Sequence, residues 1–511
     1  MEITSNKTIV KNTILLYFRM ALVTVVGIYT SRVILQMLGV EDFGVYNVAG
    51  SAVALFSFLT GALAQSSSRY ITVEIGKVVN DDIGSLVRCF KTTRAIHGIL
   101  AIIIFVLCES LGLLILYKSS IPEDKLTAAF WCFQISTLTA VVNVTQIPFN
   151  SIIIAHERMS VYAWVSIFEV FAKLLVCYLL MVSPFDKLIY YAILLFIVQM
   201  SVFITYRVYC KRNFRECSLG YTIDKEFFRP IMSFSFWNLL GSLSYSALTQ
   251  GTTILISFFF GPAVVASRAI ANQVKNYVTS FVTNFRTAIN PQIIKRNAAG
   301  NSESSRLLLF FSTNITFYLM LVIALPLMLE AKLILNLWLV EVPKYTVEFM
   351  QIGMLEMLFF VYDVSFYQIF QAEGRLKENA IYCPIMDFVG LGIVYIYYLL
   401  GGRVLAIAWC MVLLTVAQGL WLKPFLAVRL FGYSWKDFFL VYLNDIKVFL
   451  VSLIIPGTLW YTLKDTTING CVIIVVSIIS VIASSYFIGF TKPEREKIKY
   501  LILSKINKKY Q

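Results

Sequence analysis

Long apolar stretches, separated by short polar segments, run through the whole sequence. A helix needs about 20 apolar residues to cross a membrane, and this length predicts about fourteen spans. The expected spans lie near residues 12–38, 43–75, 92–117, 126–154, 159–182, 187–209, 230–259, 262–294, 306–329, 346–371, 379–400, 403–427, 438–463 and 467–490. The pattern therefore predicts an all-α polytopic membrane protein.

The composition supports a membrane protein without a separate soluble domain. The chain has 511 residues, of which 59% are hydrophobic and 14% charged, whereas a soluble protein has about 25% charged residues. The longest polar stretches, Lys211–Arg229 and the tail from Lys492, are too short to fold alone. The polar residues 1–12 lead into the first apolar helix without a small-residue cleavage site, so we expect a retained span rather than a signal peptide.

Several kinds of chemistry are not expected from this sequence. The nine cysteines are odd in number and lie mostly inside spans, which indicates free thiols. There are two histidines, and no HExxH, paired CxxC or GxxxxGK[ST] motif occurs. We therefore expect no catalytic metal, no cofactor and no built-in ATPase. Any uphill transport would need an ion gradient or a separate subunit.

Lysine and arginine are distributed unevenly between the two sets of loops. Most lie in loops on the same side as the N-terminus, and the opposite loops hold isolated cations: Lys118, Lys125, Lys187, Lys344, Arg403 and Lys464. The positive-inside rule then places both termini in the cytoplasm. The net charge of +14 is explained by basic loops beside anionic lipid, and nucleic-acid binding is not expected. The basic tail predicts an amphipathic helix at the membrane interface.

An internal repeat is visible in the chain. LGVEDFGVYNVAG at 38–50 aligns with FGPAVVASRAIAN at 260–272, a shift of 222 residues, since 260 minus 38 is 222. Both units consist of a helix, a short glycine-containing turn and a very long helix. Six spans separate them, so both halves have the same orientation in a parallel repeat. We expect two six-helix lobes and an appended hairpin; the boundaries are 1–215, 216–431 and 432–491, followed by the tail 492–511.

The eighth expected span carries a cationic stripe. At about 100° per residue, Arg268, Lys275 and Arg286 project within roughly 20° of one another. Polar residues lie on the same side, within roughly 40°: Asn272, Thr279 and Asn290. Cations facing lipid are costly, so the stripe indicates a cavity wall with an anionic ligand. The alternative is that Arg268 and Arg286 snorkel to opposite interfaces, which leaves Lys275 alone inside.

Other charged residues inside spans are candidates for the same cavity or for its energy coupling. Arg19 has no sequence neighbour to neutralise it, and the first half lacks the stripe, so Arg19 is its expected cavity cation. Arg32 either lines the cavity or pairs with Glu41 or Asp42 in the outer turn. Three acids in the tenth and eleventh spans either couple transport to protons or sodium or serve as counter-ions: Glu356, Asp363 and Asp387.

Three segments resemble the polysaccharide flippases of the multidrug/oligosaccharidyl-lipid/polysaccharide exporter superfamily. They are NTILLYFRMALVTVVGIYTSRVILQMLGVEDFGVYNVAG near the start, SSSRYITVEIGK at the end of the second span, and NPQIIKRNAAGN in the second unit. The resemblance covers essentially the whole chain. It implies two bundles around a cavity that opens alternately to each side, in a bacterial inner membrane. It also implies export of undecaprenyl-diphosphate-linked oligosaccharide, with membrane lipids and a polysaccharide polymerase or chain-length protein as partners.

The resemblance also suggests roles for individual residues. A relative that flips the peptidoglycan precursor uses cavity arginines in the first and eighth spans and an acid at the outer turn, which approximately match Arg19, Arg268 and Asp42. With Lys275 and Arg286 added from the pattern, four cations are expected to bind the diphosphate. Possible cavity or gate residues are Arg32, Asp42, Asn272 and Thr279. The last two spans are expected to form a groove for the lipid tail.

Two other functions compete with this interpretation. Multidrug antiporters of the same superfamily usually have twelve spans and acidic cavities, whereas this chain has an appended hairpin and a cationic stripe. Membrane-embedded glycan polymerases or ligases typically carry a sizeable external loop with paired arginines or a histidine. No such loop is expected here, and both histidines lie on the expected cytoplasmic side. The sequence therefore predicts a transporter rather than an enzyme.

Overall fold

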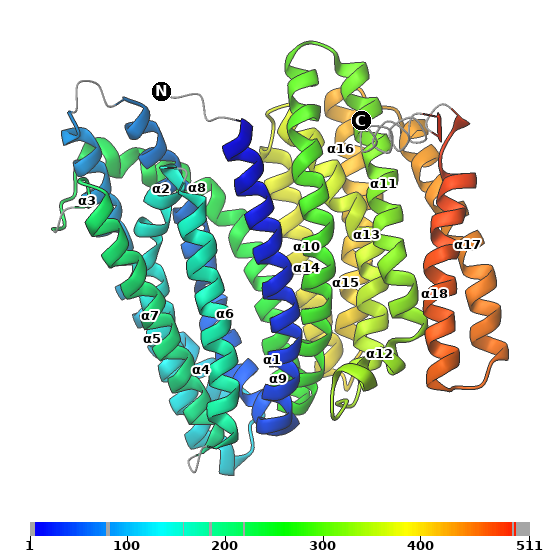
Figure 1. Cartoon of the computed structure of the whole chain (residues 1–511), viewed down its shortest axis with the longest axis horizontal. Coiled ribbons are helices and arrows are strands. Elements are labelled where there is room, and N and C mark those ends of the chain that lie inside the picture. Colours follow the sequence, from blue (N-terminus) through cyan, green and yellow to red (C-terminus); the bar gives the residue numbers. More distant parts are fainter. Residues whose placement is uncertain are drawn as a thin grey trace. The chain divides into compact units, whose positions relative to one another are not determined.

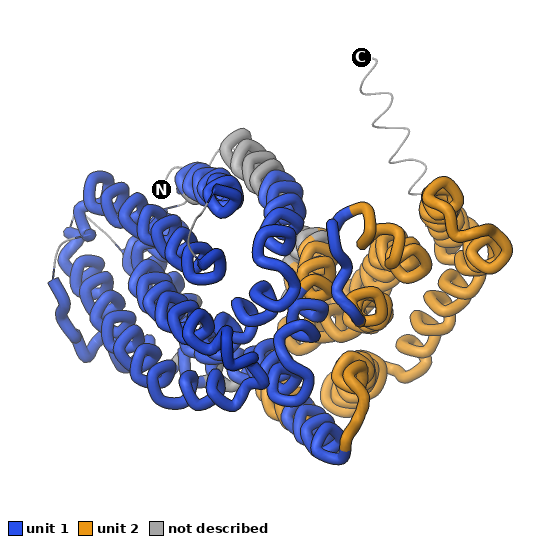
Figure 2. Tube along the Cα trace, turned by 90° about the horizontal axis from the view of Figure 1, so that it is seen from below, with its two compact units in different colours: residues 1–269, 338–344, 387–400 blue, residues 270–337, 345–386, 401–511 orange. Residues whose placement is uncertain are grey.

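The computed structural model describes most of the chain, and side chains are described from Ala21 onward. The described residues are 6–77, 82–156, 158–182, 186–217, 220–492 and 495–496. Their secondary structure is helical throughout, without a strand, which confirms the all-α class. The chain divides into two compact units (Figure 2). Unit 1 comprises Met1–Ala269, Trp338–Lys344 and Asp387–Leu400, and unit 2 comprises Ile270–Leu337, Tyr345–Met386 and Gly401–Gln511.

The helices of unit 1 are long and mostly continuous (Figure 1). In chain order they are α1 (Asn6–Ala54), η1 (Leu55–Ser57), α2 (Phe58–Lys77), α3 (Gly84–Leu107), η2 (Cys108–Gly112), α4 (Leu113–Lys118), η3 (Glu123–Lys125), α5 (Leu126–Ala155), α6 (Met159–Met181), α7 (Lys187–Asn213), α8 (Lys225–Ser246), η4 (Ala247–Gly251), α9 (Thr252–Phe260) and the first turns of α10 (Pro262–Ala298). Two of these helices begin with a side-chain cap. Asp186 accepts hydrogen bonds from two backbone N–H groups of α7, and Asp224 accepts one from a backbone N–H group of α8.

Unit 2 contains most of α10, the helices that follow it and the C-terminal hairpin. They are α11 (Ser302–Leu329), α12 (Ala331–Trp338), α13 (Thr346–Ala372), α14 (Lys377–Leu399, whose second half belongs to unit 1), α15 (Ala406–Val416), η5 (Ala417–Leu422), α16 (Lys423–Phe431), α17 (Trp435–Thr462), α18 (Thr467–Ser484) and η6 (Ser485–Gly489). The lobe boundaries expected from the repeat do not coincide with these units, so they remain a prediction about symmetry.

The helices account for every expected span. Eleven helices in the described chain are long and apolar enough to cross a membrane. One of them, Ala21–Lys77, contains the first two expected spans. The seventh and eighth expected spans form helices α8–α9 and α10 but do not meet the apolar criterion. The protein is a multi-pass membrane protein, and its most polar long helix, α10, is the one that carries the cationic stripe.

Two glycines break long helices at positions related by the repeat. Gly39 has φ 78° and ψ 171°, and Gly261 has φ 80° and ψ −180°. Only glycine adopts this backbone conformation readily, because any Cβ would clash. The two positions differ by 222 residues, since 261 minus 39 is 222, which is the shift that the sequence predicts. Each expected outer turn is therefore a single glycine between two helices.

The core of unit 2 joins the C-terminal hairpin to the bundle through aromatic contacts. Phe438 of α17 lies with its ring centroid 4.9 Å from Phe366 of α13 and 5.3 Å from Phe310 of α11. Phe366 and Phe438 are completely buried. Lipid tails are as apolar as these rings, so close packing and buried hydrogen bonds hold such helices together in a membrane. The expected appended hairpin, α17–α18, is thus part of the unit 2 core.

Candidate functional site: buried charges of the long polar helix

Arg268 is buried inside unit 1 and does not face lipid. Its side chain is on the first turns of α10 and is 6% exposed. One guanidinium nitrogen, Nη2, donates to the hydroxyl of Thr252 on α9 over 2.6 Å. The neighbouring Ser267 donates to the backbone carbonyl of Lys344 over 2.5 Å. The helix start is therefore fixed within unit 1, and the burial of Arg268 argues against the snorkelling alternative.

Arg286 is the most completely buried cation of the stripe. It lies in unit 2 with 2% of its surface exposed. Its Nη1 donates to Ser365 of α13 over 2.5 Å, and its Nη2 donates to Asn290 over 3.4 Å. The Nε has no hydrogen-bond partner among the described residues, and no described carboxylate pairs with this guanidinium. A buried cation held only by neutral groups is costly, so Arg286 is a position at which an anion would be stabilised.

Lys275 is neutralised within unit 2. Its Nζ lies 2.6 Å from Oε1 of Glu356 on α13, and the two side chains are 20% and 8% exposed. The Thr279 hydroxyl donates to the backbone carbonyl of Lys275 and contacts the sulfur of Met357 at 3.2 Å. Asn272 is half-buried and makes no side-chain hydrogen bond with a described residue. The stripe thus contains a closed ion pair at Lys275 and a different arrangement at each arginine.

A second buried ion pair connects α13 with α16. Nζ of Lys423 lies 2.5 Å from Oδ1 of Asp363 and 3.0 Å from the backbone carbonyl of the same residue. Lys423 is 4% exposed. The close approach is possible because Gly419 has no side chain: a Cβ there would lie 3.0 Å from the backbone nitrogen of Asp363. Glu356 is therefore paired with Lys275 of the stripe, whereas Asp363 is paired with Lys423, a lysine outside the stripe. A role of either acid in ion coupling stays a prediction.

Three other expected site residues have described side chains, and none of them joins these ion pairs. Asp387 is buried in unit 1 and accepts a 2.5 Å hydrogen bond from Ser244. Asp42 pairs with Lys125 at 2.8 Å, and Arg32 is exposed without a hydrogen bond or ion pair to Glu41, Asp42 or another described residue. Arg19 lies in α1, but its side chain is outside the described part. Its proposed cavity role stays a prediction.

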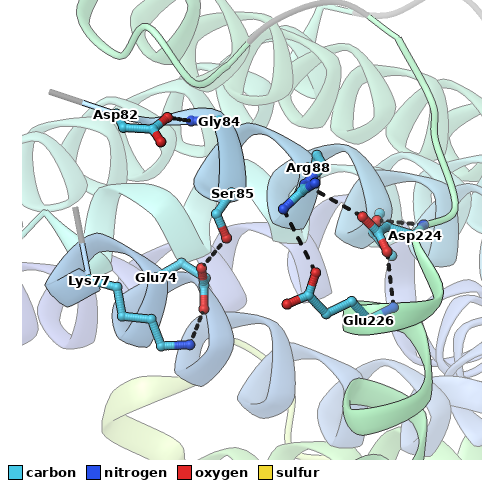
Figure 3. A network of polar contacts seen from close by, with 9 residues as sticks. Glu74, Lys77, Asp82, Gly84, Ser85, Arg88, Asp224 and Glu226 are labelled. Carbon is cyan, nitrogen blue, oxygen red and sulfur yellow. Dashed lines mark hydrogen bonds and ion pairs between the residues drawn. The ribbon is translucent and has the colours of Figure 1, made fainter. Parts of the chain in front are cut away.

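A polar network joins the ends of three helices in unit 1 (Figure 3). Glu74 of α2 is 4% exposed and accepts hydrogen bonds from Lys77 over 2.7 Å and from Ser85 of α3 over 2.5 Å. Arg88 of α3 faces the two acids at the start of α8, with N–O distances of 3.5 Å to Asp224 and 3.7 Å to Glu226 (Figure 3). Some cations that we expected to lie beside lipid headgroups therefore form ion pairs with acids of the protein itself.

Sequence reasoning missed several charged residues inside the expected spans, among them Glu109, Lys423, Asp445 and Lys447. Glu109 lies in the π-helical segment η2 and accepts from Gln134 over 3.1 Å. Asp445 is completely buried in α17, and Lys447 is exposed on the same helix. The charge itself was the signal that could have identified them, because a charged residue inside an apolar span is rare and is by default a candidate for function.

Comparisons with known proteins identify the family. A family model described as polysaccharide biosynthesis protein matches residues 9–296, which is more than half of the chain. No curated protein sequence matches the chain. Among solved structures, the chain resembles the lipid II flippase MurJ in an inward closed conformation, with a TM-score of 0.68 and 14% identity over 93% of this chain and 98% of that chain.

Two further solved structures have the same fold. An inward-facing multidrug resistance MATE family transporter of the MOP superfamily matches with a TM-score of 0.67 and 13% identity over 81% of this chain and 96% of that chain. A MOP superfamily transporter from Pyrococcus furiosus, described as having a binding pocket of reverse polarity, matches with a TM-score of 0.55 and 14% identity over 82% and 96%. These identities show a shared fold, and the sequence match shows the family: the chain belongs to the polysaccharide biosynthesis protein family.

Proposed function

We propose that this protein flips undecaprenyl-diphosphate-linked oligosaccharide across the bacterial inner membrane by alternating access. The cargo would be a repeat unit of O-antigen, capsule or exopolysaccharide, and the protein would act as a transporter without catalytic chemistry. One observation carries the proposal: Arg286 is a buried guanidinium inside a membrane unit and has no described carboxylate partner. The polysaccharide biosynthesis family supplies the expected ligand class.

The chemistry of the stripe fits a diphosphate. A guanidinium presents several N–H groups in one plane and binds phosphate oxygens through paired hydrogen bonds. Ser365 and Asn290 hold Arg286 in place through neutral hydrogen bonds. Lys275 could exchange its carboxylate partner Glu356 for a phosphate oxygen when the cavity opens, since both groups carry negative charge. Arg268 and Arg19 complete the proposed set of cations, with Asn272 and Thr279 on the same face of α10.

Other expectations become part of the same proposal. The two lobes 1–215 and 216–431 would move relative to a cavity between them, and the hairpin 432–491 would bind the lipid tail. The tail 492–511 and both termini would lie on the cytoplasmic side, as the distribution of lysine and arginine indicates. A polysaccharide polymerase or chain-length protein would receive the exported repeat unit. Arg32 and Asp42 would act at the outer gate, and Asp387 remains a candidate for ion coupling.

A multidrug antiporter is the alternative function, because MATE transporters have the same fold. A cavity for a cationic drug needs carboxylates that are available to the drug. Here Glu356 and Asp363 are each paired with a lysine at 2.6 Å and 2.5 Å. These ion pairs favour an anionic cargo. The antiporter alternative would be supported by ethidium efflux from cells that express the chain.

The test is surface glycan export in cells that lack their own polysaccharide flippase and express the matching glycan pathway. We expect Arg286→Ala to reduce export by about 10- to 150-fold, because one hydrogen bond to a charged group contributes about 1.5–3 kcal/mol. Arg286→Lys keeps the charge and loses the planar fork, so it should recover only part of the activity. Lys295→Ala, at an exposed position of the same helix, is the matched control and should export normally.

Membrane abundance must be measured for every variant, because export can also fall through loss of protein. Normal abundance with export lost only in the Arg286 variants would support the proposal. Full export by a triple variant that replaces Arg268, Lys275 and Arg286 with alanine would overturn the diphosphate site.

A further inference from the structure

The junction between the C-terminal hairpin and the bundle contains a completely buried carboxyl group. Asp445 of α17 is 0% exposed. It lies ten residues after Trp435, which is about 15 Å along a helix of 28 residues, so it is well inside the span. The hydroxyl of Tyr362 on α13 donates to Oδ2 of Asp445 over 2.9 Å. The other oxygen, Oδ1, has no hydrogen-bond partner among the described residues.

The groups around this carboxyl form a built polar site within unit 2. Nδ2 of Asn444 donates to the hydroxyl of Tyr318 on α11 over 2.7 Å and to the backbone carbonyl of Gly489 over 2.9 Å. Tyr318 is also a hydroxyl neighbour of Asp445. Position 489 must be glycine here, because a Cβ would lie 2.7 Å from the Tyr318 ring. Helices α11, α13 and α17 and the segment η6 thus meet at one set of neutral hydrogen bonds.

No described cation pairs with Asp445. Lys423 of α16 is bound to Asp363, and Arg306 of α11 donates to the backbone carbonyls of residues 431 and 432. Lys447 is two residues further along α17 but is exposed on another face. The segments α18 and η6 contain no Asp, Glu, Lys or Arg. The remaining titratable groups of the packed elements are Tyr318, Tyr362, Tyr367, Tyr442, Tyr461, Glu303, Glu348, Glu356, Glu373, Arg429, Lys436, Asp437, Cys471 and Tyr486.

We propose that Asp445 is a proton-binding site, that its proton is bound in this conformation, and that release of the proton separates α17 and α18 from α11 and α13. An ionised carboxylate without a cation inside a membrane unit carries a desolvation cost of several kcal/mol. A protonated carboxyl group avoids this cost and keeps the hydrogen bond that it accepts from Tyr362. A neutral Asp445 is therefore compatible with the closed junction, and an ionised one is not.

Release of the proton destabilises the closed junction and so favours movement of the hairpin. The O–H bond of the carboxyl group breaks, its electron pair stays on the oxygen, and the proton leaves to bulk water as hydronium. The resulting carboxylate needs water or a cation, and no described cation pairs with it in the closed junction. Opening the hairpin from the bundle admits water to the charge. Coupling of this proton to transport rests on the proposed flippase function, in which the hairpin binds the lipid tail of the cargo.

Infrared difference spectroscopy tests the bound proton without any transport substrate. The full-length protein would be reconstituted in phosphatidylcholine vesicles, and wild-type spectra at neutral pH would be compared with those of Asp445→Asn. We expect a C=O stretching band of a neutral carboxyl group in the wild type that is lost in Asp445→Asn and retained in Asp437→Asn, a matched change nearer the start of the same helix. Absence of a difference band at neutral pH would overturn the proposal.

Two further measurements keep the test decisive if Asp445→Asn folds poorly. In the wild type, raising the pH should convert the neutral band into carboxylate bands. In Tyr362→Phe, the neutral band should move to higher frequency, because the carboxyl group loses a donated hydrogen bond. A band that is unmoved in Tyr362→Phe would assign the proton to another residue and overturn the proposal.

Transport measurements test the coupling role separately. Asp445→Asn stays neutral and has no proton to release, so we expect the junction to stay closed and glycan export to be low at every external pH, while Asp437→Asn keeps the wild-type profile. An unchanged pH profile in Asp445→Asn would overturn coupling through this residue. Full export by the triple variant of Arg268, Lys275 and Arg286 together with an intact carboxyl band would overturn the flippase proposal alone. Loss of export in Arg286→Ala together with no carboxyl band would overturn the proton site alone.

Discussion

Gly44 makes the closest backbone contact of any described glycine, and its replacement should destabilise unit 1. A Cβ at position 44 would lie 2.0 Å from the carbonyl oxygen of Pro262, 2.4 Å from its carbonyl carbon and 3.0 Å from its Cα. Optimal contacts between heavy atoms are about 3.5–4.0 Å, so Gly44→Ala must push α1 away from the start of α10 by about 1.5 Å. The obstacle is backbone, which cannot rotate away as a side chain can.

Overpacking of a tight contact typically costs about 1–3 kcal/mol, and a backbone obstacle places Gly44→Ala at the upper end or beyond. The matched control is Gly50→Ala, six residues further along the same helix, where a Cβ would meet nothing within 4 Å. That control should be neutral or stabilise by about 0.5–1 kcal/mol, because alanine favours the helix interior. The two variants make the same chemical change in one helix, so their difference isolates the contact with Pro262.

Thermal unfolding of the purified protein in detergent, followed by a thiol-reactive dye on the buried cysteines, is the suitable assay. We expect a clearly lower midpoint for Gly44→Ala and an unchanged or higher midpoint for Gly50→Ala. Equal midpoints for the two variants would refute the reasoning, since the contact would then be absent or easily relaxed. Because Gly44 is five residues after the break at Gly39, Gly44→Ala should also reduce export.

Three other predictions follow from the ion pairs and the loops. Glu356→Gln should lower the unfolding midpoint, because it leaves Lys275 largely buried without an anion, and Lys275→Met combined with Glu356→Gln should recover most of the loss in a double-mutant cycle. Burial opposes ionisation of Glu216, but hydrogen bonds from His156 and from the backbone, together with the charge of His156, outweigh burial and hold the pKa of Glu216 below its usual 4.5. The resulting stability is present above pH 4.5 and is lost as the pH falls through the lowered pKa, so Glu216→Gln should flatten the acid side of a pH–midpoint curve. Gly489→Ala should lower the midpoint through its clash with Tyr318 at 2.7 Å, and Gly457→Ala, where the nearest atom is an ordinary 3.6 Å away, should not.

Hydropathy and glycine position were sufficient to predict most of the fold. A span is a local property of about 20 consecutive residues, so every expected span falls on a helix of the described chain. The repeat predicted both outer turns, because Gly39 and Gly261 keep the same unusual backbone at equivalent positions. The charge pattern also indicated that α10 is not lipid-facing along the stripe, and the structure buries Arg268 and Arg286.

The pairing of charges was decided by the tertiary structure alone. Glu356 and Asp363 share a helix face, yet their partners are 81 and 60 residues away in the chain, and helical periodicity carries no information about which distant helix packs against that face. In the sequence, Asp445 is simply an acid within the appended hairpin. Its environment depends on the tyrosines of α11 and α13 that lie beside it, and these are distant in the chain. The sequence determined the helices and where charged residues occur within the spans. Packing between helices decided which of these charges form ion pairs and which are buried without an ionic partner among the described residues.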